Sequence, residues 1–172
     1  MFGLFLTCIK PLNTTIVLWF IFQSDNWLAA LAILWLMLCD IFDGYFFRRS
    51  RLAIPKYLWW RRIADVVGDR FAIEVVLLTM IFRLDFPFYL YATDLVREFV
   101  LLGIWLYSYK IGRPFREPNM YSRLSTLFVG IMAITWLTFP TATAWFFLPV
   151  FVFGVIGCEQ YWETIQLRVQ NI

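Results

Sequence analysis

The chain has 172 residues, of which 62% are hydrophobic, 21% aromatic and 16% charged, with a formal net charge of +3. A soluble domain is about 45–50% apolar and about 25% charged, and so small a protein has too much surface to hide this excess. The composition excludes a soluble domain, a disordered segment and a secreted disulfide scaffold. We predict an all-α integral membrane protein, in which residues 1–172 form one domain of six transmembrane helices of about 20 residues each.

The histidine and cysteine content limits which metal sites and catalytic mechanisms the chain could have. Histidine is absent, which excludes His-ligated zinc or haem and any mechanism with imidazole as the base. The cysteines lie far apart in apolar runs and have no CxxC spacing, so we expect packing residues rather than metal ligands or disulfide partners. They are Cys8, Cys39 and Cys158.

Apolar runs predict three spans in the N-terminal half of the chain, at 1–22, 27–47 and 62–82. The first run contains Lys10 and Pro11, so this helix is either kinked or preceded by an interfacial segment. No small-residue cleavage site follows it, which argues against a signal peptide. Asn26 is the predicted cap of the second helix, and a basic segment containing Pro55 leads to the third.

Three further runs predict the spans of the C-terminal half, at 89–109, 124–139 and 142–167. A turn with Asp85 and Pro87 precedes the fourth helix, and Pro140 separates the fifth from the sixth. Tyr161 and Trp162 fall where an aromatic belt would meet the membrane surface.

The basic residues are concentrated in alternate connections. Ten of the fifteen lie around the second and fourth connections, whereas the first, third and fifth together hold only Arg83. Because basic loops face the cytoplasm, we expect a multi-pass protein with both termini and its active site on the cytoplasmic side, in the inner or plasma membrane if the source is bacterial.

Four carboxylates interrupt the second and third apolar runs. Asp40 and Asp43 are three residues apart, and Asp65 and Asp69 are four apart, so each pair lies on one face of a helix. The topology brings both pairs to one depth near the inner membrane surface. Carboxylates within membrane spans mark ion sites, proton relays or chemistry.

A divalent cation would remove the repulsion between these carboxylates. All-oxygen ligands favour Mg²⁺ or Mn²⁺, and magnesium is usually shared with substrate phosphates. Gly44 leaves bare backbone for a phosphate or sugar, and Arg48 can reach a phosphate oxygen. Two alternatives remain: buried ion pairs with neighbouring arginines, and a proton or cation transporter, although transporters place their acids nearer the midplane.

These residues resemble the signature of the CDP-alcohol phosphatidyltransferase family, Asp-x2-Asp-Gly-x2-Ala-Arg followed by Gly-x3-Asp-x3-Asp. The match comprises Asp40, Asp43, Gly44, Arg48, Asp65 and Asp69. Arg97-Glu98 resembles a pair common in the phosphatidylglycerophosphate-synthase branch, and residues 122–126 resemble the segment that opens the family's fifth helix. The resemblance leaves the branch open between that one and a phosphatidylinositol type.

The resemblance implies transfer of a phosphatidyl group from CDP-diacylglycerol to a small alcohol, with release of CMP, in phospholipid biosynthesis. It implies two Mg²⁺ or Mn²⁺ ions held by Asp40, Asp43 and Asp65, with Asp69 as the base and as a further ligand. Gly44 and Arg48 would contact the nucleotide. The implied partners are the CDP-lipid, the polar alcohol, membrane lipids and a second copy of the chain in a homodimer, with no nucleic acid.

We expect the acceptor to be a polyol phosphate such as glycerol 3-phosphate or inositol phosphate. The candidate residues for its phosphate are Arg97, Arg113, Arg116 and Arg123. The loop arginines have an alternative role, which is only to set the topology. Phe47 and Arg61 stand where the family has alanine and glycine, which leaves as an alternative a degenerate member that binds lipid or a partner subunit without turnover.

Overall fold

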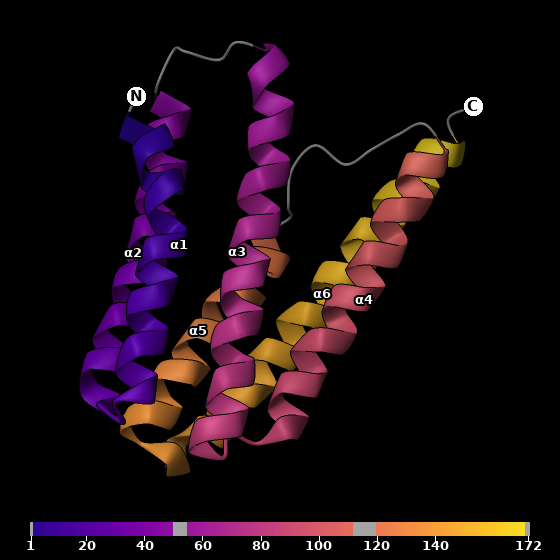
Figure 1. Ribbon diagram of the computed structural model, residues 1–172. Coiled ribbons are helices and arrows are strands. Elements are labelled where there is room, and N and C mark those ends of the chain that lie inside the picture. Colours follow the sequence, from indigo (N-terminus) through magenta and orange to yellow (C-terminus); the bar gives the residue numbers. More distant parts are fainter. Residues whose placement is uncertain (1, 50–54, 112–119, 171–172) are drawn as a thin grey trace. The chain divides into compact units, whose positions relative to one another are not determined.

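The computed structural model describes the backbone of residues 2–49, 55–111 and 120–170, and side chains over 11–42, 70–111 and 120–167, together with position 68. All regular structure in these ranges is helical (Figure 1), which confirms the all-α prediction. The long helices are α1 Phe2–Phe22, α2 Asn26–Arg49, α3 Pro55–Leu84, α4 Phe88–Lys110, α5 Met120–Thr138 and α6 Thr143–Gln170. A 3₁₀ turn, Pro140–Ala142, precedes α6.

Contacts between helices divide the chain into two compact units. The first comprises 1–86 and 133–140, and the second comprises 87–132 and 141–172. In the first unit α1 packs against both α2 and α3. Ala29 and Ala30 on α2 are buried with Val17 and Ile21 of α1, and small side chains of this kind let two helices approach closely.

The end of α5 belongs to the first unit through Trp136. Its indole N–H donates to the carbonyl oxygen of Leu84 at 3.1 Å, and its ring meets Phe86 edge to face at 5.6 Å between centroids. Phe86 is almost fully buried. The bend after α3 is made possible by Asp85, which adopts a left-handed backbone with φ 52°.

In the second unit α4 lies along α6 (Figure 1). Their cores include Leu90 of α4 and Val150 of α6, both nearly inaccessible. The first part of α5 contributes Phe128, which stacks on Phe153 of α6 at 5.5 Å between ring centroids. Tyr89 of α4 lies 6.2 Å from Phe147 of α6 between ring centroids, so aromatic contacts join both α4 and α5 to α6.

Three helix N-termini differ from the sequence prediction: the cap of α2, the start of α3, and the start of α5, which begins at Met120 rather than at residue 124. Asp25, not Asn26, caps α2, because its Oδ1 accepts the backbone N–H of Leu28 at 3.1 Å. The predicted third helix begins at Pro55 rather than at residue 62, since proline is favoured in a first helical turn, where its missing N–H leaves no partner unsatisfied. The first helix is a single element, Phe2–Phe22, that continues through Pro11.

Two helical segments of the described residues, Met120–Thr138 and Pro140–Leu167, are long and apolar enough to cross a membrane. Shorter apolar stretches occupy Pro11–Phe22 and Asn26–Phe42. Large apolar side chains also face outward, with Phe82 and Trp145 each 81% exposed. Such an outer surface suits a hydrocarbon environment. Six spans stay a prediction, because two segments of the described residues have the length and hydropathy of a span.

The reassigned cap gives a direct test. Asp25→Ala should lower the free energy of unfolding by about 1 kcal/mol, because the N–H of Leu28 loses its acceptor at the start of α2. Thermal unfolding of the purified protein in detergent measures the change. The matched variant Asn26→Ala should have little effect, and an equal loss in both variants would contradict the assignment.

Candidate functional site

The four carboxylates of the sequence motif lie on two helices of the first unit. Asp40 and Asp43 are in the C-terminal half of α2, and Asp65 and Asp69 are in the N-terminal half of α3. Helical backbone at both places confirms that each pair shares one helix face. Asp40 is exposed at the surface of α2. The side chains of Asp43, Asp65 and Asp69, and of Arg48, lie outside the described residues, as does the environment of Gly44.

A buried amide of α1 lies against α2 beside the motif. Asn13 is 6% exposed, and its Nδ2 donates to Sγ of Cys39 at 3.8 Å. Cys39 immediately precedes Asp40, so Asn13 contacts α2 one residue before the first motif residue. The sequence-based site lacks Asn13, although a polar patch within the apolar run 1–22 was a readable signal.

The cysteines follow the packing prediction where they are described. Cys39 is a buried thiol and Cys158 is a half-buried thiol, and neither is part of a disulfide. The side chain of Cys8 lies outside the described residues.

The chemistry of the motif's donor set fits a hard divalent cation, because it consists entirely of carboxylate oxygens. Among the side chains that the structure describes, no three acidic or sulfur ligands come together as a metal site. Three of the four motif carboxylates fall outside that part of the chain. The metal site therefore stays a prediction that rests on the helix register of α2 and α3.

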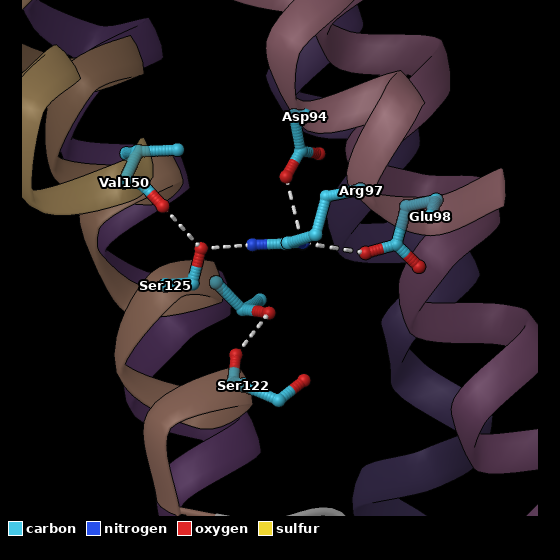
Figure 2. A network of polar contacts seen from close by, with 7 residues as sticks. Asp94, Arg97, Glu98, Ser122, Ser125 and Val150 are labelled. Atoms are coloured by element: carbon cyan, nitrogen blue, oxygen red, sulfur yellow. Dashed lines mark hydrogen bonds and ion pairs between the residues drawn. The ribbon is translucent and has the colours of Figure 1, made fainter. Parts of the chain in front are cut away.

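A second polar cluster, the Arg97 network, lies in the second unit (Figure 2). Arg97 Nη2 lies 2.7 Å from Oδ1 of Asp94 and 2.5 Å from Oε1 of Glu98. Its Nε donates to the same Glu98 oxygen at 3.1 Å, and its Nη1 donates to Oγ of Ser125 on α5. Ser125 in turn donates to the carbonyl oxygen of Val150 on α6 at 2.9 Å. One guanidinium thus links three helices.

The network depends on close packing between α4 and α6. Asp94 is 0% exposed and Arg97 is 6% exposed. A Cβ at Gly154 of α6 would lie 3.0 Å from Cδ of Arg97 and 3.4 Å from Oγ of Ser125. Such distances leave little room for a side chain, so glycine lets the stem of Arg97 pass across α6 toward α5.

The four arginines predicted to bind the acceptor phosphate differ in where the structure places them. Arg97 is ion-paired with Asp94 and Glu98 and donates a hydrogen bond to Ser125, so an acceptor phosphate would have to replace these partners. Arg123 is exposed in the first turns of α5. Arg113 and Arg116 lie outside the described residues. The structure does not group Arg97 with Arg123, since one is buried and the other is at the surface.

Asp94 is absent from the sequence-based site, yet it is the most deeply buried acid that the structure describes. Its signal was the i,i+3 spacing to Arg97 within an apolar run. Ser125 and Gly154 could not have been linked to Arg97 in this way, because they lie on other helices.

The network predicts a stability effect at Arg97. Arg97→Met should lower the free energy of unfolding by about 3–5 kcal/mol, because it leaves the buried Asp94 carboxylate without its cation. Thermal unfolding in detergent measures this loss. Arg97→Met combined with Asp94→Asn should recover part of it, and Arg123→Met should unfold as the wild type does. Wild-type stability in Arg97→Met would contradict a structural role for the network.

Comparison with known proteins gives one family. The family model for CDP-alcohol phosphatidyltransferase matches residues 4–156, a range that contains all of the motif carboxylates and the Arg97 network. No curated protein and no solved structure matches the chain. Because the match covers most of the sequence and includes the motif that suggested the same family, the chain belongs to the CDP-alcohol phosphatidyltransferase family, whose members transfer substituted phosphate groups.

Proposed function

We propose that the protein transfers a phosphatidyl group from CDP-diacylglycerol to a small alcohol and releases CMP. The observation that carries this proposal is the spacing of four carboxylates on the helical backbone of α2 and α3, within the range that matches the family. The family as a whole depends on divalent metals. A Mg²⁺ or Mn²⁺ pair held here would neutralise the diphosphate and the charge that develops during transfer.

Each motif residue has a role that fits its chemistry. Asp40, Asp43 and Asp65 would hold the ions, and Asp69 would accept the proton of the acceptor hydroxyl while contributing to ligation. The hydroxyl oxygen forms a bond to the phosphorus that carries the diacylglycerol, and the bond from that phosphorus to the CMP oxygen breaks. Gly44 and Arg48, in the last turns of α2, would contact the nucleotide.

For the acceptor we propose a polyol phosphate such as glycerol 3-phosphate or inositol phosphate. Arg113, Arg116 and Arg123 lie around one connection, and guanidinium groups bind phosphate by paired, charge-assisted hydrogen bonds. Arg123 is exposed and available for this contact. Arg97 is the weaker candidate of the four, because carboxylates already occupy its donors.

The proposal places the reaction in a membrane. The two candidate spans and the outward-facing aromatic residues support this location. Six crossings with both termini in the cytoplasm, and a homodimer, complete the proposal. The alternation of basic loops supports the six crossings and the cytoplasmic termini. Membership of the family supports the homodimer.

A degenerate member that binds CDP-lipid without turnover is the second candidate. Phe47 and Arg61 favour it, because they place large side chains where the family has alanine and glycine beside the nucleotide. Metal-dependent binding of CDP-diacylglycerol without CMP release would support the degenerate member over the enzyme.

Activity can be measured with labelled CDP-diacylglycerol and a panel of alcohols in reconstituted vesicles. We expect CMP release that stops with EDTA and returns with Mg²⁺ or Mn²⁺. Asp69→Asn should lower the rate by about 10²–10⁴-fold, because the hydroxyl loses its base. Asp25→Asn, an acid of the α1–α2 turn, is the matched control and should stay active. The absence of CMP release with every alcohol would contradict the enzyme proposal.

The acceptor proposal has its own test. Arg123→Gln should raise KM for a polyol phosphate about tenfold, because one charge-assisted hydrogen bond to the phosphate is lost. KM for CDP-diacylglycerol should stay unchanged in the same initial-rate assay. An unchanged KM for the phosphate-bearing acceptor would remove Arg123 from the acceptor site.

A further inference from the structure

A cavity of about 750 Å³ lies between α4 and α6 in the second unit. This volume is within the range of about 300–1,000 Å³ typical of ligand sites. Most of its lining is aliphatic or aromatic, from both helices: Val96, Val100 and Ile104 on α4, and Val150, Phe151 and Val155 on α6. Val96, Val100 and Phe151 are also exposed at the surface, so the cavity opens outward.

The cavity extends along α4 and α6. Its lining extends from Val150 to Trp162 on α6, which corresponds to about 18 Å at 1.5 Å per residue. Contacts of Tyr89 with Phe147 and of Tyr107 with Trp162 show that α4 and α6 run in the same direction (Figure 1). One leaflet of a bilayer contributes about 15 Å of hydrocarbon, so the cavity has the length of one acyl chain.

Arg97 does not make this cavity a polar site. Its guanidinium is paired with Asp94 and Glu98, and its carbon stem lies over Gly154. The arginine therefore presents mainly methylene groups to an occupant, as long basic side chains do when their charged ends are engaged elsewhere.

The C-terminal end of the cavity has a different chemistry. Glu159 and Trp162, three residues apart on α6, both line it there and are both exposed. The ring of Tyr107 on α4 lies 5.9 Å from that of Trp162 and supports its position. A carboxylate next to an indole face favours an ammonium group over a phosphate or a neutral headgroup.

We propose that the α4–α6 cavity binds one acyl chain of an ammonium-bearing phospholipid, whose headgroup amine lies against Glu159 and Trp162. The proposal requires α6 to lie within a bilayer and is independent of the transfer reaction. Length and apolar lining select an acyl chain, and the negative charge at the rim selects a lipid that carries an amine.

Native mass spectrometry of the purified full-length protein tests the proposal. The protein is titrated with phosphatidylethanolamine or phosphatidylglycerol with identical acyl chains. We expect phosphatidylethanolamine to bind about tenfold more tightly, because the carboxylate and the indole each favour the amine. Glu159→Gln should reduce the preference to about twofold, whereas Glu163→Gln, an exposed acid one turn further along α6 and outside the cavity, should leave it unchanged.

A second variant tests the acyl-chain part separately. Val155→Trp fills the cavity from an exposed position and should abolish tight binding of both lipids. Thermal unfolding verifies that each variant is folded. Equal binding of the two lipids to the wild type, an equal effect of Glu159→Gln and Glu163→Gln, or retained lipid in folded Val155→Trp would overturn the proposal. CMP release is a separate measurement, so failure of this proposal leaves the transferase proposal standing.

Discussion

A charged group in an apolar chain must find its counter-charge nearby, because transfer of an unpaired ion out of water has a free-energy penalty of several kcal/mol. Sixteen per cent of the residues are charged and 62% are hydrophobic, so this constraint governs where the charges can stand. In the second unit Arg97 meets it within the protein, between Asp94 and Glu98. On α2 and α3 the motif carboxylates have a spacing that would let a divalent cation balance their charge. The same cation would take part in the proposed transfer reaction.

The Arg97 network and the first motif residue differ in their exposure to solvent. The Arg97 network joins α4, α5 and α6 through one guanidinium, and its members Asp94, Arg97 and Ser125 are nearly inaccessible to solvent. Its members form ion pairs and hydrogen bonds with one another, which is typical of a cluster that stabilises the fold. The motif on α2 and α3 begins with an exposed residue, Asp40, and lies next to a glycine in sequence, as a site that admits a substrate phosphate requires.

Local patterns in the sequence were enough to predict the helices, because hydrophobic runs and breaks are encoded residue by residue. Their ends were less predictable. Whether Asp25 or Asn26 caps α2 depends on backbone angles at the turn, where Ser24 has φ 59°. Pro55 marked a connection in the sequence but begins α3 in the structure. The role of Arg97 depends on Ser125, 28 residues away, and such packing between helices has no local signature. Helical backbone at Asp40, Asp43, Asp65 and Asp69, by contrast, follows from local sequence patterns, and α2 and α3 have it there; the metal site itself stays a prediction.

In the proposed site, carboxylates from α2 and α3 bind the same divalent ions. Electron paramagnetic resonance of the purified protein titrated with Mn²⁺ tests this shared coordination, in the wild type and in a variant with Asp40→Asn and Asp65→Asn. We expect two bound Mn²⁺ per chain in the wild type in the presence of CDP-diacylglycerol, and loss of both in the variant, because each ion would need ligands from both helices. Unchanged Mn²⁺ binding in a folded variant would contradict it.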